Sequence, residues 1–375
     1  MKNLLWLNIL LFLFSNALFA QNKHTQSAEK TLLVGTYTDK GSEGIYVFRF
    51  NTKTGDFKHI NNTKGIKNPS FLSVSPNKKY VYSVNEEGNL GGVSAFSFNQ
   101  KTGELKLLNS SSANGDHPCH VEVNPDGKYL VVGNYTGGNL SLFSLNKDGS
   151  LNPNPQTISH SGKSINAARQ EKPHVHSVNW APNHTNLFVP DLGIDKIMHY
   201  KLNKATGQLE VANPAFTAVE AGTGPRHFTF HPNGKYAYVI QELSSQITAF
   251  TVKGMVLEKI ETVSTLPIDN TIDNTTADIH ISPDGKFLYG SNRGHNSLAI
   301  YSINQKNGSL GYIENQSIMG KTPRNFTIDP TGNYILVANQ DSNNITIFKR
   351  NKSTGKLKPT GKEIKISRPV CLKMI

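Results

Sequence analysis

The chain contains almost no cysteine and no long apolar run. Cys119 and Cys371 are its only cysteines among 375 residues, so a framework of several disulfides cannot hold the fold together. An apolar stretch from Leu4 to Phe14 is shorter than the roughly 20 residues that a membrane-spanning helix needs. No long helical period runs through the remaining sequence. These absences argue against a disulfide-stapled fold, a membrane helix and a helical bundle.

Several familiar catalytic motifs are also missing. The sequence has no Gly-x-Ser-x-Gly nucleophile elbow and no His-Glu-x-x-His zinc pair. Gly320-Lys321-Thr322 lacks the first glycine of a phosphate loop, and Gly222-Thr223-Gly224 lacks the third glycine of a dinucleotide fingerprint. The chemistry must therefore come from a different arrangement of side chains.

What the sequence does contain is a unit repeated about every fifty residues, which is the length of one β-propeller blade. Six units open on a residue followed by proline, namely Asn68-Pro69, His117-Pro118, Lys172-Pro173, Gly224-Pro225, Thr322-Pro323 and Arg368-Pro369. A further copy without the proline begins at Thr276. The chain thus has seven units.

Each unit has the pattern of four short strands. In the unit that opens at Pro118, an alternating stretch ends in a proline turn at Val121–Gly127, and an apolar run follows at Tyr129–Gly133. A third strand at Leu140–Leu145 and a glycine turn at Lys147–Gly149 lead to the fourth. Four strands per repeat are typical of a β-propeller, because one such sheet cannot bury both faces until its neighbours stack on it.

The last unit is incomplete and the first segment completes it. Arg368–Ile375 supplies a single strand, and Lys30–Lys58 supplies the strands that this unit lacks. We therefore predict an all-β fold, a seven-bladed β-propeller of four-stranded antiparallel blades whose ring is closed by the N- and C-terminal strands in one blade. It would form a single domain over residues 30–375.

The first residues have the pattern of an export signal. Lys2 precedes the apolar run, and Ala17–Ala20 offers a small residue for cleavage. We predict a signal peptide at residues 1–20, a short linker at 21–29, and a mature protein that is periplasmic or extracellular, without membrane attachment after cleavage.

Cys119 and Cys371 fall two blades apart in the repeat alignment, too far for a disulfide. We expect two free, mostly buried thiols.

The charge is strongly basic, with 39 Lys and Arg against 27 Asp and Glu and a net charge of +12. Such an excess can indicate a nucleic-acid partner. Most lysines, however, lie in turns between third and fourth strands, such as Asn51–Gly55, Asn99–Gly103 and Asn351–Gly355. These turns are spread around the outer rim of a propeller, so we expect a solvated surface and no nucleic acid.

Polar side chains recur where they would line the centre of the ring. On the first strand of each unit they alternate with apolar ones, as in His120/Glu122, Ser177/Asn179, His227/Thr229, Asp278/His280 and Asn325/Thr327. The starts of first strands and the ends of second strands meet on one face, because adjacent strands are antiparallel. We expect one bowl at the channel mouth containing His117, His120, His174, His176, Arg226, His227, Arg293, Arg324, Glu86 and Glu242. Arginines suit an anion, and imidazoles and carboxylates suit proton transfer.

Six stretches together resemble a known family: Leu33–Thr38, Arg169–Ser177, Val189–Lys196, Gly224–His227, Ala277–Gly285 and Ser291–Ser297. The chain is similar over about residues 31–375 to the seven-bladed propeller lactonases, typified by propeller-type 6-phosphogluconolactonase and related to fungal carboxymuconate cyclases. The resemblance implies hydrolysis of a sugar (aldono-δ-) lactone without a nucleotide cofactor. We expect no cofactor and name no metal-ligating residues.

The resemblance also implies site residues. Its motifs make His176, Glu242, Arg226 and Arg293 the expected catalytic residues. They make the expected substrate-binding residues His120, His174, Asp191, His227, His280 and Arg324. His176, or Glu242 acting through it, would take a proton from water, and the two catalytic arginines would stabilise an oxyanion or hold the substrate's anionic group.

Three functions remain open at this point. The first is a lactonase acting as a monomer on a small anionic or sugar lactone; the export signal departs from the cytoplasmic 6-phosphogluconate pathway and leaves an unphosphorylated aldonolactone or another cyclic ester as substrate. The second is a carboxymuconate-type cycloisomerase or lyase using the same arginines. The third is a non-enzymatic binding platform, since fold alone does not prove activity.

Overall fold

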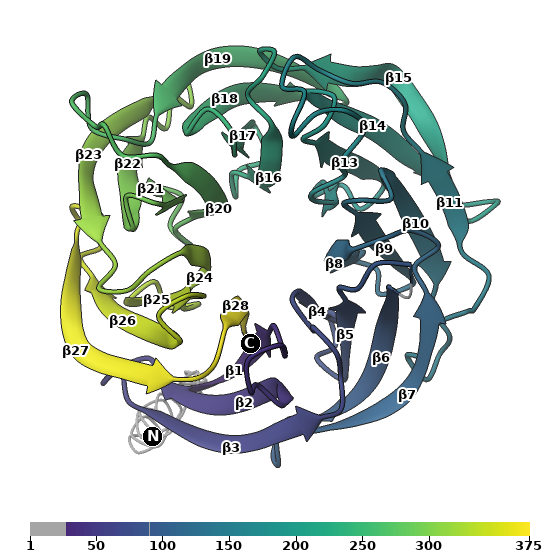
Figure 1. Ribbon diagram of the computed structural model, residues 1–375, viewed down its shortest axis with the longest axis horizontal. Helices are drawn as coiled ribbons and strands as arrows, with labels where there is room; N and C mark the ends of the chain where they lie inside the picture. Colours follow the sequence, from purple (N-terminus) through teal and green to yellow (C-terminus); the bar gives the residue numbers. More distant parts are fainter. Residues whose placement is uncertain (1–27, 90) are drawn as a thin grey trace, which may run out of the picture.

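The computed structural model describes residues 28–89 and 91–375. The named elements of these residues are all β-strands, arranged as seven four-stranded sheets around a common centre (Figure 1). The predicted all-β, seven-bladed propeller is confirmed. The predicted export signal at 1–20 and most of the predicted linker at 21–29 lie outside the described residues. Within the described ranges there is no helix that could cross a membrane.

Each blade runs from an inner strand at the centre to an outer strand at the rim. The first blade contains β28 (Pro369–Met374), β1 (Glu29–Thr36), β2 (Gly44–Asn51) and β3 (Phe57–Lys64), and the second contains β4 (Leu72–Val74), β5 (Tyr80–Asn85), β6 (Gly92–Asn99) and β7 (Glu104–Ser112). The third blade contains β8 (Pro118–Val123), β9 (Tyr129–Asn134), β10 (Asn139–Ser144) and β11 (Gln156–Ser159). The fourth contains β12 (Asn179–Trp180), β13 (Asn186–Asp191), β14 (Lys196–Asn203) and β15 (Gln208–Ala218). The other three are β16 (Pro225–Phe230), β17 (Tyr236–Gln241), β18 (Gln246–Lys253) and β19 (Val256–Ser264); β20 (Thr275–Ile281), β21 (Phe287–Arg293), β22 (Ser297–Ile303) and β23 (Leu310–Ser317); and β24 (Pro323–Ile328), β25 (Tyr334–Asn339), β26 (Asn344–Arg350) and β27 (Leu357–Lys365).

The ring is closed by strands from the two ends of the chain. β28 pairs antiparallel with β1, with Val34 opposite Leu372, and Figure 1 shows the yellow C-terminal strand beside the purple N-terminal ones. Thr31 and Ile375 exchange two backbone hydrogen bonds of 3.0 and 2.9 Å. This pairing confirms the predicted closure, and it removes an edge that would otherwise present unpaired backbone groups.

Buried apolar side chains fill the spaces between blades, and buried tyrosines tie neighbouring blades together. The hydroxyl groups of Tyr82, Tyr238 and Tyr289 donate hydrogen bonds to the carbonyls of Gly149, Gly308 and Gly355 at 3.1, 2.8 and 2.8 Å. In each case the glycine lies in a turn of the next blade. The aromatic ring of the tyrosine is therefore buried between two blades while its hydroxyl group has a hydrogen-bond partner. Cys119 and Cys371 are buried and free, as predicted.

One inner strand is much shorter than the others. β12 contains two residues, although the preceding segment stays close to β13: His176 N–H donates to the Pro190 carbonyl at 3.1 Å. Proline has no N–H to return the bond, so the regular ladder is interrupted there. The irregular connector between β11 and β12, residues 160–178, reaches the mouth of the channel and carries several of the side chains described next.

Candidate active site at the channel mouth

β-bulges at the start of the inner strands aim arginines into the channel. The pairing register shifts between Pro118 and His120, between Pro225 and His227, and between Pro323 and Asn325. The residues within these bulges are Cys119, Arg226 and Arg324, and all three line a small void of about 10 Å³ at the channel mouth. A bulge breaks the strict alternation of side chains, so two consecutive residues such as Arg226 and His227 can both face inward.

Three arginines converge on one carboxylate, that of Glu242, which follows β17. Arg226 Nε lies 2.9 Å from Glu242 Oε2, Arg293 Nη2 lies 2.9 Å from the same oxygen, and Arg169 Nη2 lies 2.6 Å from Oε1. Burial by itself would raise the pKa of Glu242, but Arg293, Arg226, His176 and Arg169 together hold it well below its usual range. Glu242 is therefore ionised and a weak base.

His176 lies beside this cluster and is the better proton acceptor. Its Nε2 is 3.7 Å from Glu242 Oε2, and its Nδ1 is 3.8 Å from the sulfur of Cys119. Burial, and after it the charge of Arg226, holds the pKa of His176 well below its usual range. The imidazole is neutral at neutral pH and can accept a proton, and the adjacent carboxylate would stabilise the imidazolium ion that forms.

A second carboxylate, Glu86, lies on another side of the mouth. Tyr37 donates its hydroxyl group to the two carboxylate oxygens at 3.0 and 2.9 Å, and the Ser70 hydroxyl group donates to it as well. Arg324 Nη2 is 4.0 Å from Glu86. The guanidinium groups of Arg324 and Arg368 each lie 5.4 Å from the centroid of the Tyr37 ring. These contacts hold Arg324 at the mouth, where its role in binding was predicted.

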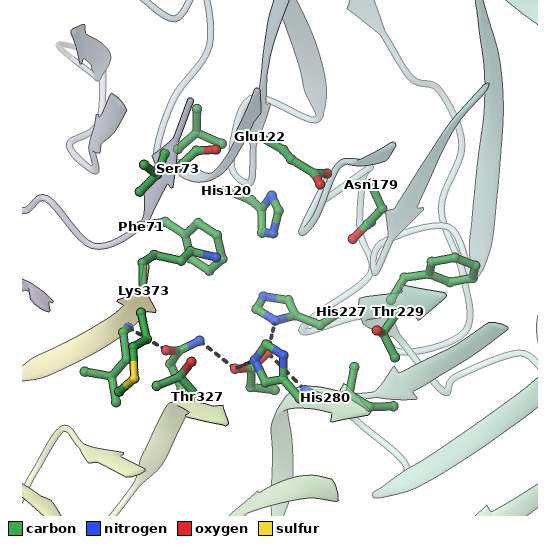
Figure 2. Close-up of a pocket in the computed structure, with 18 of the residues that line it drawn as sticks. Phe71, Ser73, His120, Glu122, Asn179, His227, Thr229, His280, Thr327 and Lys373 are labelled. Atoms are coloured by element: carbon green, nitrogen blue, oxygen red, sulfur yellow. Dashed lines mark hydrogen bonds and ion pairs between the residues drawn. The ribbon is translucent and has the colours of Figure 1, made fainter. Parts of the chain in front are cut away.

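The other predicted binding residues occupy three different places. His174 stacks on Tyr135 with ring centroids 4.5 Å apart, at the edge of the mouth. His120 and His227 form a layer with Phe71 further down the channel, with centroid separations of 4.1, 5.4 and 5.8 Å among the three rings (Figure 2). His280 lies beyond this layer, with Nε2 2.9 Å from Asp278 Oδ2. Asp278 also accepts a hydrogen bond of 2.8 Å from His227 Nδ1.

Asp191, another predicted binding residue, contacts polar groups of the chain itself in this structure. Its side chain has no exposed surface. One carboxylate oxygen is 2.6 Å from His160 Nδ1, and the other accepts the backbone N–H groups of His174 and Gly193 at 2.7 and 3.0 Å. Asp191 therefore anchors the connector at 160–178 from below. The repeat alignment placed the end of β13 near the mouth, but it could not show which way this side chain turns.

Arg169 and Tyr135 also belong to the site, although neither was predicted as a site residue. Arg169 Nη2 donates to the Tyr135 hydroxyl oxygen at 3.2 Å as well as to Glu242. Its side chain is 39% exposed, so it is the most accessible of the arginines on Glu242. Arg169 lies on the connector at 160–178, where the repeat alignment has no equivalent position. The stretch Arg169–Ser177 that supports the family resemblance was the available signal.

Buried histidines predict a loss of stability in mild acid. Burial holds the pKa of His120 and His176 well below the usual range and lowers those of His199 and His227 to about 4. Below about pH 6.5 the unfolded chain binds a proton at each of these histidines, whereas the folded chain does not. Each histidine therefore lowers the free energy of unfolding by up to about 1.4 kcal/mol for each unit that the pH falls between 6.5 and its folded pKa. Glu122 has the opposite sign, because burial raises its pKa from 4.5 to about 7 and the folded chain binds its proton first.

The net expectation is a melting temperature that falls steadily as the pH decreases from about 6.5 to 4.5. It can be measured by circular dichroism at closely spaced pH values. His199 packs on Phe188 away from the channel, so His199→Gln provides a matched test, and the slope should become shallower in this variant. A melting temperature that stays constant over this range would contradict the expectation.

Comparison with known proteins places this geometry in a family. The model of the seven-bladed β-propeller lactonases matches residues 31–374. A 6-phosphogluconolactonase of Formosa agariphila is 41% identical over 79% of this chain and 85% of its own length. A 6-phosphogluconolactonase of Bacillus subtilis is 36% identical over 78% and 83%. The solved structure of the periplasmic gluconolactonase of Pseudomonas aeruginosa is 33% identical and superposes with a TM-score of 0.88 over 92% of this chain and 99% of that chain. The chain therefore belongs to the seven-bladed β-propeller lactonase family.

Proposed function

We propose that this lactonase hydrolyses an aldono-δ-lactone at the channel mouth, with His176 as the general base. The proposal rests on one observation. An Arg293 N–H group without a hydrogen-bond partner and the neutral imidazole of His176 belong to side chains that both contact Glu242 Oε2. Arg293 Nε is buried and has no hydrogen-bond partner within the described part of the chain, while its Nη2 is held by Glu242 and by the Thr276 carbonyl. An acceptor that becomes negatively charged during the reaction would satisfy this donor.

The proposed reaction follows from these positions. His176 takes a proton from a water molecule, and the water oxygen attacks the lactone carbonyl carbon. Arg293 stabilises the negative charge that develops on the carbonyl oxygen. The ring C–O bond then breaks, and the ring oxygen takes the proton from His176, which leaves a hydroxy acid. Glu242 acts through His176 and the arginines as a positioning residue.

The charge of the mouth favours an anionic or strongly polar substrate. The four arginines Arg169, Arg226, Arg293 and Arg324 face the two carboxylates of Glu242 and Glu86. Such an excess of arginine suits a phosphate or carboxylate group. The predicted export signal and the similarity to a periplasmic gluconolactonase support an unphosphorylated aldonolactone, whereas the relatives named 6-phosphogluconolactonase support the phosphorylated one.

A pH-stat assay on a small set of lactones tests the proposal. Glucono-δ-lactone, its 6-phosphate and a five-membered γ-lactone are compared with the spontaneous rate of each. We expect proton release well above the spontaneous rate with at least one δ-lactone, and the ratio of kcat/KM values for the two δ-lactones decides whether the substrate is phosphorylated. No release above the spontaneous rate with either δ-lactone would contradict the proposal and favour a binding platform.

A further inference from the structure

A second and larger cavity lies in the channel on the other side of the aromatic layer. Its volume is about 420 Å³, which is within the range of roughly 300–1,000 Å³ found for small-molecule sites. Phe71, His120 and His227 contribute to its wall (Figure 2), and Phe71 and His227 also line the small void at the mouth, so they lie between the two spaces. Glu242, Arg293 and His176 do not line it. This chamber is therefore chemically distinct from the candidate active site.

Each of the seven blades contributes one polar side chain to this chamber at the same position of its inner strand. Three are the hydroxyl-bearing residues Ser73, Thr229 and Thr327, and a fourth is the amide of Asn179. The remaining three are ionisable: Glu122, His280 and Lys373. Figure 2 shows these side chains arranged around the cavity. We call this set the polar ring. A structural role alone does not require seven polar groups around an open space of this size.

The cation of the polar ring lacks a partner of opposite charge. Lys373 places its ammonium group 4.5 Å from the centroid of the Phe71 ring, and it forms no ion pair of 4.0 Å or less within the described ranges. The nearby carboxylate of Asp278 is already bonded to His227, His280 and Asn325 at 2.8, 2.9 and 2.5 Å. Lys373 can therefore receive the carboxylate group of a ligand.

Glu122 offers a complementary contact. One of its oxygens accepts the backbone N–H of Trp180 at 3.0 Å, which is the one hydrogen bond to this carboxylate among the described residues. Burial raises its pKa to about 7, so near neutral pH the group can accept or donate a hydrogen bond. Hydroxyl groups are the ligand groups that suit such a partner, and the hydroxyl-bearing residues of the ring suit them too.

We propose that the polar ring binds a small polyhydroxylated carboxylate of the aldonate class, with its carboxylate on Lys373 and its hydroxyl groups on Glu122, Thr229 and Thr327. An aldonate is the product of the reaction proposed above, so the choice of this ligand rests on the proposed function. Because the chamber is separated from the mouth, product bound there would not compete directly with the lactone.

Calorimetric titration with sodium gluconate tests this proposal. Lys373→Met removes the cation while keeping apolar bulk over Phe71, and we expect it to weaken gluconate binding at the chamber by about tenfold or more. Thr229→Val is a second variant that removes a hydroxyl group without changing charge, and it should weaken binding by several-fold. The control is Lys352→Met, which removes an exposed lysine on the β26–β27 turn and should bind gluconate as the wild type does. Thermal melting verifies that each variant is folded.

Other probes separate this site from the mouth and from a general anion site. Arg293→Met alters the mouth, and it should retain the gluconate binding that Lys373→Met loses. Sorbitol, which lacks the carboxylate, and acetate, which lacks the hydroxyl groups, should each bind more weakly than gluconate. The proposal is overturned if Lys373→Met binds gluconate normally, if Arg293→Met alone abolishes binding, or if acetate binds as well as gluconate. Lactone hydrolysis measured on the same samples shows separately whether the proposed function stands.

Discussion

Replacing His176 with glutamine is expected to lower kcat for lactone hydrolysis at neutral pH by about 10²–10⁴-fold, the usual contribution of a general base. Glutamine is similar in size and keeps polar atoms in the position, but it cannot take a proton from water. The His176 side chain is 6% exposed, and its Nε2 lies 3.7 Å from Glu242 Oε2. We therefore expect little change in the melting temperature and a large change in turnover.

The pH profile of the His176 variant separates the two bases that the sequence left open. The pKa of His176 lies well below its usual range because of burial and Arg226, so kcat/KM of the wild type should be flat near neutral pH and fall only in acid. That acid limb should disappear in His176→Gln if His176 is the base. His184, a half-buried histidine paired with Asp126 in the turn between β12 and β13, provides the control, and His184→Gln should keep wild-type activity. Full activity in His176→Gln would mean that another group takes the proton.

The fold could be predicted in detail because its physical signals are local and repeated. The proline openings mark the start of four inner strands, since β8, β16, β24 and β28 begin at the proline of their unit. The alternation of apolar and polar residues on these strands fixed which side chains face the channel, and the polar ring lies at those positions. The incomplete last unit required a partner strand, which fixed the pairing of β28 with β1.

The site was predictable only in part because it departs from the repeat. Alignment of the units brought Arg226, Arg293, Glu242 and His176 to one mouth, and the structure does bring them together. Depth along the channel was not predicted, so His120 and His227 were expected at the mouth although they lie in the aromatic layer further down the channel. Arg169 was missed because the connector at 160–178 has no counterpart in other blades. The bulges that turn Arg226 and Arg324 inward depend on backbone geometry that composition does not reveal.

The two arginines that share Glu242 Oε2 are expected to differ when each is replaced with methionine. Arg293 has a side chain that is 14% exposed and a buried Nε without a partner in the described part of the chain, and we propose that it binds the oxyanion. Arg293→Met should lower kcat by about 10²–10³-fold, as loss of one oxyanion donor does, with a smaller loss of melting temperature than Arg226→Met, because the Arg293 side chain is less buried.

Arg226 is more deeply buried than Arg293, and its replacement should have a larger effect on stability. Its side chain is 2% exposed, and its Nε and Nη1 are engaged by Glu242 and by the Ala277 carbonyl at 2.9 and 2.5 Å. Burial, and after it Arg293, lowers the pKa of Arg226 to about 10, so it remains charged at neutral pH. Arg226→Met leaves a buried carboxylate with one cation fewer and a buried carbonyl without its donor, and such losses cost about 3–5 kcal/mol when one partner of a buried pair is removed.

We therefore expect Arg226→Met to lower both turnover and the melting temperature, and Arg293→Met to lower turnover with a smaller loss of melting temperature, because its side chain is 14% exposed against 2% for Arg226. Steady-state kinetics and thermal melting on the two purified variants are sufficient to compare them. Arg350→Met is a matched control outside the channel, because Arg350 is also buried and pairs with Asp284 at 2.9 Å; it should lower the melting temperature while the folded enzyme keeps its turnover. Equal losses of stability in the two channel variants would mean that Arg293 is a structural partner of Glu242, and the oxyanion would then have to be bound by Arg169, the remaining accessible arginine on that carboxylate.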